Sequence, residues 1–390
     1  MVPFRLLVQE KPQTITIEKL VYGGEGLARL EGRVVLAPFV LPGETVSVEI
    51  DRAKNDVWRG KLIEVLEASP ARVAPGCPYF QRCGGCHYQH IDYTAQLEQK
   101  RAILREALQR VGKIEFAGGI EAISGEPWQY RNRVQLHLEN GKVGYYGQHS
   151  RDLMAIEHCP IASPKISETI GKIDARADTA LELFTNETEV QVNVVDRVPR
   201  AALTALAALG VTTPIEYSGF QVSRNSFFQV NRFLIDRLVD CAISDAKGAW
   251  ALDLYAGVGL FARKLAEQFE KVTAVESGGS SFRDLEHNFP QGAVKSSAEE
   301  YLVALEEKPD FILADPPRAG LGKTVVRELA RIRPRRITIV SCDPATLARD
   351  LHGLTGENYR IEKITLVDLF PQTFHLETVV ELCASEARPD

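Results

Sequence analysis

The second half of the chain alternates between apolar runs and amphipathic segments. Downstream of Trp250, apolar runs cover residues 251–254, 272–276, 311–314 and 337–340, and segments with helical spacing of apolar positions separate them. Alternation of this kind predicts a doubly wound, mostly parallel sheet with helices between its strands. We therefore expect an α/β fold in this half of the chain.

The first 70 residues follow a different pattern. Apolar and polar positions alternate over residues 14–17 and 44–50, and an apolar run over residues 33–36 follows a glycine-containing turn. Short strands at this spacing are typical of a small β-barrel. Such barrels often bind single-stranded nucleic acid, so the basic side chains of this segment fit either an RNA site or an ordinary charged surface.

Two further segments separate the barrel from the α/β half. Asp92 is a suitable N-cap for a helix whose apolar face includes Leu104 and Leu108 and which ends at Gly112. A strand-rich segment over residues 130–161 follows. The chain is therefore expected to contain a barrel, a smaller mixed region and an α/β domain.

The composition is that of a globular protein, with 45% hydrophobic and 25% charged residues. No apolar run reaches the roughly 18 residues that a bilayer-spanning helix needs, and the N-terminus lacks the order of a signal peptide. We expect a cytoplasmic protein without a membrane partner. The formal net charge of -6 argues against nonspecific coating of nucleic acid, but leaves room for a local RNA site.

Acidic residues stand at the ends of the apolar runs. Asp253 precedes a glycine turn over residues 257–259, and Glu276 ends the next run, where a carboxylate can accept ribose hydroxyls. Asp315, followed by two prolines, ends a third run. The glycine turn would also suit NAD, but a carboxylate at Asp253 favours the cationic sulfonium of S-adenosylmethionine over a pyrophosphate.

A thiol and a further carboxylate are candidates for covalent and acid–base chemistry. Cys342 follows the run over residues 337–340 and precedes a helix, whose N-terminus is expected to lower the pKa of the thiol. Glu377 is a candidate general base if it lies beside that thiol and a methyl donor. A surface hairpin is the alternative interpretation of Glu377 and of the neighbouring His375.

Four of the seven cysteines suggest a metal centre rather than a disulfide scaffold. Cys77, Cys83 and Cys86 are clustered, and Cys159 supplies a fourth thiolate. Four thiolates suit zinc or an iron–sulfur cluster equally in number. Three clustered cysteines plus one remote cysteine, with glycines beside them, favour a [4Fe–4S] cluster.

Together these motifs resemble the RNA (uracil-5-)-methyltransferase family, and most closely its branch with an N-terminal TRAM barrel and an iron–sulfur cluster. The resemblance covers nearly the whole chain. It implies a TRAM/OB-like barrel over residues 1–70 and a central α+β domain, carrying the cluster, over residues 71–90 and 118–218. It further implies a Rossmann-like methyltransferase domain, formed by residues 91–117 and 219–390.

The resemblance also implies roles for individual residues. S-adenosylmethionine would contact Gln229, Tyr255, Glu276 and Asp315. Cys342 would be the nucleophile and Glu377 the base. The cluster ligands would be Cys77, Cys83, Cys86 and Cys159.

The reaction implied is methylation of carbon 5 of a uridine in RNA through a covalent cysteine–uracil adduct. We expect a monomer acting on 23S ribosomal RNA in preference to transfer RNA, which stays an alternative. Departures from the family pattern at Leu260 and Ser297 leave open a non-catalytic RNA-binding or assembly protein. An RNA cytosine-5 methyltransferase would need a second cysteine motif beside Asp315, and an NAD oxidoreductase leaves Cys342 and Glu377 unexplained.

Overall fold

The computed structural model describes residues 11–54, 57–357 and 359–385, and the chain divides into two compact units. The first unit comprises Met1–Ile103, Tyr146–Met154 and Phe370–His375, and the second comprises Leu104–Tyr145, Ala155–Leu369 and Leu376–Asp390. The first ten residues of the predicted barrel domain and the last five of the predicted methyltransferase domain lie outside the described residues. The three-domain division stays a prediction.

The first unit contains a six-stranded sheet in the order β1-β5-β6-β4-β3-β2. The predicted alternation places Ile15, Val46 and Val48 in one buried cluster with Val35 and Trp58. The strands are β1 (Gln13–Thr16), β2 (Lys19–Leu20), β3 (Glu25–Leu30), β4 (Arg33–Pro38), β5 (Thr45–Lys54) and β6 (Val57–Glu67).

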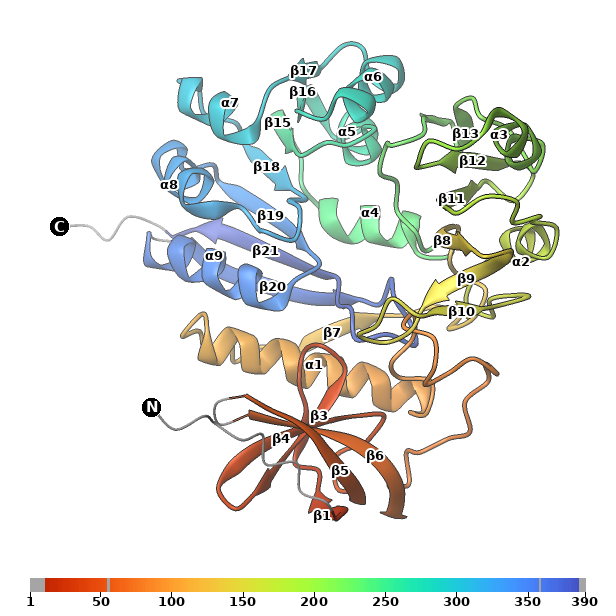
Figure 1. Ribbon diagram of the computed structural model, residues 1–390. Coiled ribbons are helices and arrows are strands. Elements are labelled where there is room, and N and C mark those ends of the chain that lie inside the picture. Colours follow the sequence, from red (N-terminus) through yellow and green to blue (C-terminus); the bar gives the residue numbers. More distant parts are fainter. Residues whose placement is uncertain (1–10, 55–56, 358, 386–390) are drawn as a thin grey trace, which may run out of the picture. The chain divides into compact units, whose positions relative to one another are not determined.

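The second unit is built on an eight-stranded sheet in the order β17-β16-β15-β18-β19-β21-β20-β7 (Figure 1). The five strands from β17 to β19 are parallel, and β21 is antiparallel to β19. The predicted mostly parallel sheet is therefore confirmed. The strands are β7 (Ile120–Ile123), β15 (Gly248–Leu254), β16 (Phe269–Glu276), β17 (Ala293–Lys295), β18 (Phe311–Ala314), β19 (Arg336–Ser341), β20 (Tyr359–Val367) and β21 (Thr378–Ala384).

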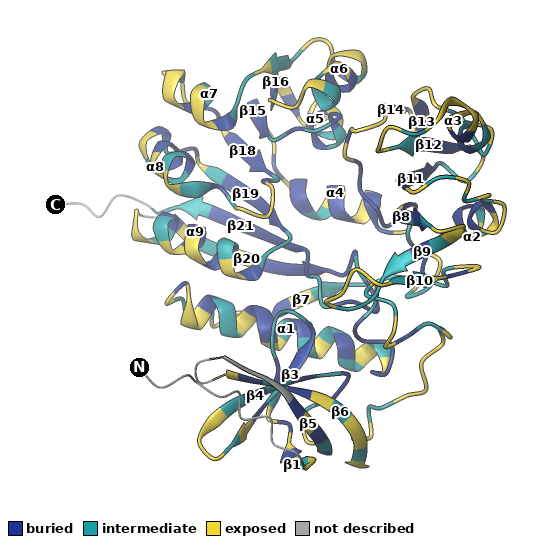
Figure 2. Cartoon of the chain, in the orientation of Figure 1, coloured by how far each residue is buried: buried dark blue, intermediate teal, exposed yellow. Residues whose placement is uncertain are grey.

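Helices cover this sheet and bury its central strands. All of β18 is buried, as are the last five residues of β15, which is the pattern of a parallel sheet covered on both faces (Figure 2). Among the helices, α4 packs against α5, and α8 packs against both α7 and α9. They are α4 (Ile235–Ile243), α5 (Leu260–Leu265), α6 (Gly279–Asn288), α7 (Ala298–Ala304), α8 (Gly322–Ile332) and α9 (Pro344–Gly356).

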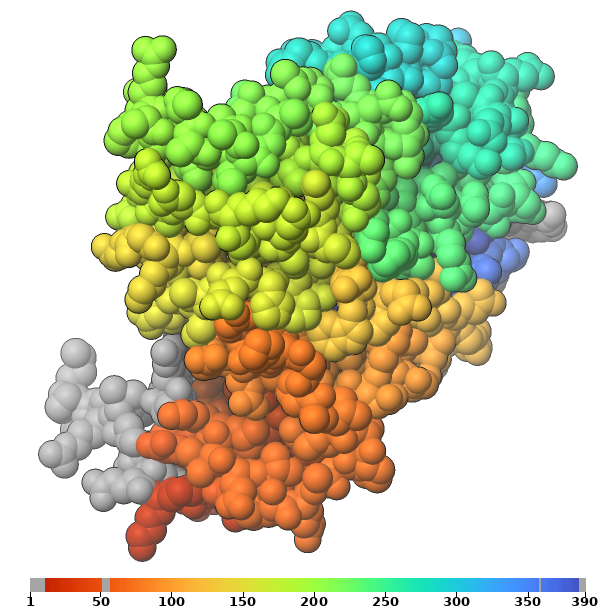
Figure 3. Space-filling view, turned by 90° about the vertical axis from the view of Figure 1, so that its right-hand side faces the viewer, coloured from red at the N-terminus to blue at the C-terminus, as the bar shows by residue number. Residues whose placement is uncertain are grey.

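A five-stranded sheet in the order β10-β9-β8-β11-β12, most of which belongs to the second unit, confirms strands in the segment over residues 130–161. In Figure 3 this region, coloured yellow to light green, forms a continuous surface. Its elements are β8 (Arg133–Glu139), β9 (Lys142–Tyr146), β10 (Leu153–Ala155), α2 (Pro164–Ile170), β11 (Thr179–Thr185), β12 (Val190–Val194), α3 (Arg200–Ala207), β13 (Ile215–Tyr217) and β14 (Phe220–Val222).

The helix predicted after Asp92 is α1 (Tyr93–Arg110), which begins in the first unit and ends in the second. A carboxylate oxygen of Asp92 accepts the amide N–H of Thr94 at 3.0 Å, so Asp92 caps the helix as predicted. Within the described residues, no helix combines the length and the apolar character needed to cross a membrane.

Candidate active site

The predicted acidic and thiol residues of the α/β half gather at one edge of the eight-stranded sheet. Asp253 lies near the end of β15, Glu276 ends β16, Asp315 follows β18, and Cys342 follows β19. Because these strands are parallel, their carboxyl ends meet at one edge, which is where open α/β sheets bind ligands. The sheet topology therefore brings together side chains that are far apart in sequence.

Glu377 reaches the same edge because β21 runs in the opposite direction. Ser341 of β19 pairs with Thr378 of β21, so the next positions outward on the two strands are Cys342 and Glu377. Opposed residues of an antiparallel pair lie about 4.5–5.5 Å apart between Cα atoms. Glu377 is only 5% exposed. The surface-hairpin interpretation of Glu377 is therefore wrong, and the charge of its carboxyl acts on the Cys342 thiol.

Gln229 is held next to Asp315 by a buried asparagine. Its side-chain amide nitrogen lies 3.4 Å from Oδ2 of Asp315. The side chain of Asn132, which is fully buried, donates to the carbonyl of Gln229 at 3.1 Å, and the Asn132 amide donates to the carbonyl of Val230 at 2.9 Å. No signal in the sequence points to Asn132, because a lone asparagine before a strand does not show which distant segment it will hold.

The carboxylate of Glu276 organises the glycine turn. One of its oxygens accepts the amide N–H of Gly257 at 2.9 Å, and the other accepts that of Gly278. Tyr255, which precedes the turn, has a φ of 61°, an uncommon backbone conformation for a residue with a side chain. Each carboxylate oxygen has a further lone pair, so Glu276 can hold the turn and still accept ribose hydroxyls.

Asp253 is a fully buried carboxyl with little hydrogen bonding. The residue is 0% exposed, neither carboxylate oxygen has a hydrogen bond of normal geometry in the described part of the chain, and the backbone N–H of Ala262 only partly favours its charged form. Burial, followed by the negative charge of Asp315, raises the pKa of Asp253 well above its usual range. A buried carboxylate without a partner is costly, and a nearby positive charge would relieve this cost.

Two further carboxyl groups share this environment. Burial of its carboxyl raises the pKa of Asp315, a half-buried residue, to about 7. Burial, together with the charge of Asp315, raises the pKa of Glu377 well above its usual range. A bound cation would stabilise the ionised forms of these buried carboxyl groups. The site is therefore suited to a positively charged ligand such as a sulfonium compound.

The expectation for the Cys342 thiol is corrected by its surroundings. Burial raises the pKa of Cys342 to about 11, and the negative charges of Glu377 and Asp315 act in the same direction. The positive charge of Arg318 opposes them. The expected lowering by the helix N-terminus is wrong for this structure, because two neighbouring carboxyls and burial outweigh it.

The cysteines of the predicted cluster belong to different units. Cys77, Cys83 and Cys86 are in the first unit, and Cys159 is in the second. In the described part of the chain, no group of three or more His, Cys, Asp or Glu side chains is placed to hold a metal ion. The prediction of an iron–sulfur site is therefore not supported by the structure.

The two departures from the family pattern have structural roles. The hydroxyl of Ser297 accepts the amide N–H of Glu300 and caps α7. Leu260 packs, partly buried, against a cluster that contains Phe228 and Val258. Neither residue disrupts the hydrogen bonds of Glu276 or Gln229.

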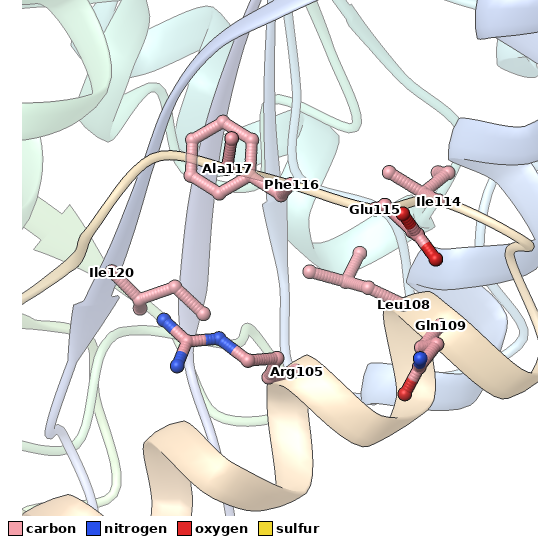
Figure 4. A pocket seen from close by; sticks show the side chains of 8 residues that line it. All are labelled: Arg105, Leu108, Gln109, Ile114, Glu115, Phe116, Ala117 and Ile120. Carbon is pink, nitrogen blue, oxygen red and sulfur yellow. The ribbon is translucent and has the colours of Figure 1, made fainter.

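A cavity of about 370 Å³ lies at the end of α1 (Figure 4). It is formed by the last turns of α1 and the segment that follows this helix. The lining residues are Arg105, Leu108, Gln109, Ile114, Glu115, Phe116, Ala117 and Ile120. None of the residues predicted to contact the donor or the uridine is among them.

Comparison with known proteins identifies the family. A family model described as tRNA (Uracil-5-)-methyltransferase matches residues 187–385, and a TRAM domain model matches residues 10–63. The chain belongs to the tRNA (uracil-5-)-methyltransferase family. This confirms the predicted S-adenosylmethionine-dependent RNA (uracil-5-)-methyltransferase and its N-terminal TRAM domain.

Relatives match the chain over almost its whole length. A protein of Aquifex aeolicus named an uncharacterized RNA methyltransferase is 31% identical, and the match covers 96% of this chain and 99% of the relative. A protein of the same description from Thermotoga maritima is 29% identical and covers 95% of this chain, with 98% of its own length matched.

A solved structure has the same fold. It is the Pyrococcus abyssi tRNA (uracil-54, C5)-methyltransferase in complex with S-adenosyl-L-homocysteine. The match has a TM-score of 0.73 at 25% identity, and covers 94% of this chain and 99% of the Pyrococcus protein. The predicted methyltransferase fold is thus confirmed.

Proposed function

We propose that this enzyme methylates carbon 5 of a uridine in ribosomal RNA, with Cys342 as nucleophile and Glu377 as base. The observation that carries the proposal is the pairing of Ser341 with Thr378, since Cys342 and Glu377 are the next residues beyond this last pair of two adjacent strands. A nucleophile and a base within reach of one ring are the arrangement that this chemistry needs.

The residues proposed to hold the donor are Gln229, Tyr255, Glu276 and Asp315. Support comes from the acidic residues of this sheet edge. The pKa values of Asp253, Asp315 and Glu377 are raised, and a bound cation would stabilise their ionised forms. A bound S-adenosylmethionine supplies the methyl group and one positive charge. Transfer converts the sulfonium to a neutral thioether, so the carboxyls favour the reactant over the product at this site.

The reaction begins at carbon 6 of the uracil, because carbon 5 alone is too weak a nucleophile to take a methyl group. The Cys342 thiolate adds to carbon 6, and the ring becomes an enolate whose carbon 5 attacks the methyl carbon. Carbon 5 then holds both the methyl group and its original proton. Glu377 removes that proton, the bond between sulfur and carbon 6 breaks, and the ring double bond returns.

The uridine has to leave the base stack to reach these groups. Enzymes that act on a ring atom use an unpaired base or flip the base out of its helix. The TRAM domain supports a contact to RNA outside the catalytic residues, since small barrels of this kind bind single strands.

Transfer RNA is the second candidate substrate. The solved relative from Pyrococcus abyssi acts, by its title, on uracil 54 of transfer RNA. Ribosomal RNA is favoured by the cysteine spacing over residues 77–86, which resembles the cluster-bearing branch of the family. The two candidates differ in substrate and share the reaction.

Transfer of labelled methyl from S-adenosylmethionine separates these candidates. We expect label in 5-methyluridine when the enzyme is incubated with unmodified ribosomal RNA, and background label in a parallel pool of unmodified transfer RNA. Label in the transfer RNA pool alone would overturn the ribosomal substrate and keep the reaction. No 5-methyluridine in either pool, from folded protein that does not bind S-adenosylmethionine in calorimetry, would favour the non-catalytic RNA-binding alternative.

We also propose that Cys77, Cys83, Cys86 and Cys159 hold a [4Fe–4S] cluster. The support is the cysteine spacing, which resembles that of the cluster-bearing branch of the family, and the amide N–H that Gly85 directs at the sulfur of Cys83 across 3.4 Å. Hydrogen bonds of this kind to sulfur tune iron–sulfur centres. No step of the methyl transfer is assigned to the cluster.

Metal and sulfide analysis tests the cluster directly. Anaerobically purified protein is expected to contain iron and acid-labile sulfide in equal amounts, and Cys159→Ser is expected to lose both. Cys241→Ser, which removes a half-buried cysteine outside this set, serves as the control. Zinc without sulfide, or a full iron content in Cys159→Ser, would contradict the assignment.

A further inference from the structure

One face of α9 contacts the loop that follows Asp315. Thr346, Arg349 and Asp350 are spaced so that they share a face of the helix. The Thr346 hydroxyl donates to the carbonyl of Arg318 at 3.1 Å, and the Arg349 guanidinium donates to the carbonyl of Ala319 at 2.8 Å. Two successive carbonyls of the loop are thus bound by one helix.

Asp350 adds a further hydrogen bond to the backbone of the same loop. The residue is 4% exposed, and its Oδ2 accepts the amide N–H of Leu321 at 2.7 Å. Its other carboxylate oxygen receives two hydrogen bonds from Arg349, at 3.0 and 2.8 Å. The ion pair between Arg349 and Asp350 thus holds both side chains in place. Asp350 can then bind the amide of Leu321, and Arg349 the carbonyl of Ala319.

Gly320 shows how closely the loop approaches the helix. Its φ of 77° lies in the region that favours glycine. A Cβ at this position would lie 2.3 Å from Oδ2 of Asp350 and 2.7 Å from a guanidinium nitrogen of Arg349. A side chain at this position would therefore have to displace the Asp350 carboxylate and the Arg349 guanidinium, as well as adopt a left-handed backbone conformation.

Both the helix and the loop that form this contact are close in sequence to residues of the proposed site. The first turn of α9 begins directly after Cys342, and Asp343 caps it by accepting the amides of Ala345 and Thr346. The loop carries Arg318, whose positive charge acts on the Cys342 thiol against the charges of Glu377 and Asp315. A shift of the loop relative to α9 would therefore move the cation that favours the thiolate.

We propose that Thr346, Arg349 and Asp350 are positioning residues that clamp the loop of residues 318–321 to α9 and so keep the Arg318 guanidinium within electrostatic reach of Cys342. The proposal rests on the proposed function, because it takes Cys342 as the nucleophile. In this proposal Thr346, Arg349 and Asp350 act through Arg318, and none of them contacts the uridine. Their effect should appear in the reactivity of the thiol and in kcat, with donor affinity unchanged.

Alkylation of Cys342 by iodoacetamide tests the clamp without RNA or donor. The pH dependence of the rate is followed on the Cys342 peptide by mass spectrometry. Asp350→Asn and Thr346→Val are expected to shift the profile to higher pH, so that alkylation at a fixed pH below the thiol pKa is about threefold slower. Arg318→Gln should do the same, and Arg360→Gln, which removes an exposed arginine of β20, should leave the rate unchanged.

The double variant Arg318→Gln with Asp350→Asn decides whether the residues act together. If Asp350 works by placing Arg318, the double variant reacts no more slowly than Arg318→Gln alone. Additive slowing would overturn the proposal. So would a lowered melting temperature in Asp350→Asn and Thr346→Val with an unchanged alkylation profile, because that result describes a purely structural contact.

The outcome is separable from that of the proposed function. Thiol alkylation needs neither RNA nor donor, so the predicted shifts together with an absence of methyl transfer to any RNA would reject the proposed function and keep the clamp. Methyl transfer by the parent protein, with alkylation unchanged in the clamp variants, would reject the clamp alone.

Discussion

Cys342→Ala is expected to abolish methyl transfer while leaving the binding of S-adenosylmethionine intact. Without a thiolate no adduct forms at carbon 6, and carbon 5 of the uracil stays too weak a nucleophile to attack the methyl group. Loss of a covalent nucleophile typically lowers turnover by a factor on the order of 10⁴ or more. Alanine also removes a half-buried side chain at the sheet edge rather than in the core, so folding should persist.

The comparison is made with Cys383→Ser, which alters another half-buried cysteine on β21, outside the proposed site. Initial rates of label transfer and calorimetric donor affinity are measured for both variants and the parent protein. Methyl transfer by Cys342→Ala at a rate near that of the parent would remove this residue from the mechanism. A joint loss of transfer and donor affinity would mean that the residue supports the donor site instead.

The backbone arrangement of the site could be predicted because it follows from strand polarity. Runs over residues 251–254, 311–314 and 337–340 are almost entirely apolar, and buried parallel strands require this composition. Once the strands are parallel, whatever follows each run must lie at one edge of the sheet. The residue pattern thus placed Asp315 and Cys342 at that edge, and the family motif added Glu377.

The chemistry of Cys342 could not be predicted in the same way. A helix N-terminus is visible in sequence, and its field lowers the pKa of a nearby thiol. The influences that raise the pKa are burial and the negative charges of Glu377 and Asp315. Both carboxyl groups belong to segments next to other strands, and the fold brings them to the thiol in a site of low polarity. Local sequence gives one contribution to the pKa, and the fold gives the larger ones.

Long-range hydrogen bonds were missed for a similar reason. Asn132 holds Gln229, and Asp350 holds Leu321, across loops whose approach depends on the whole sheet. Neither residue carries a spacing signal that names its partner. The glycine at position 320 is compatible with a close backbone approach, but a glycine alone does not show which residue approaches.

Glu377→Gln is expected to stop the reaction after methyl transfer and to accumulate a covalent complex of protein and RNA. Glutamine has nearly the shape of glutamate but cannot take the proton from carbon 5, so the bond between sulfur and carbon 6 cannot be eliminated. Addition of the thiolate should not suffer, because the charge of Glu377 raises the pKa of Cys342 and the substitution removes that charge. The variant therefore separates the two halves of the reaction.

Denaturing electrophoresis with labelled methyl donor measures this complex. We expect a slowly migrating band that contains protein, RNA and methyl label in Glu377→Gln, and none in the double variant with Cys342→Ala. Glu362→Gln, an exposed carboxyl on β20, should turn over without accumulating adduct. If Glu377→Gln releases 5-methyluridine at the parental rate, another group removes the proton. If its adduct carries no methyl label, Glu377 acts before methyl transfer. The proposed order, in which Glu377 removes the proton after methyl transfer, would then be wrong.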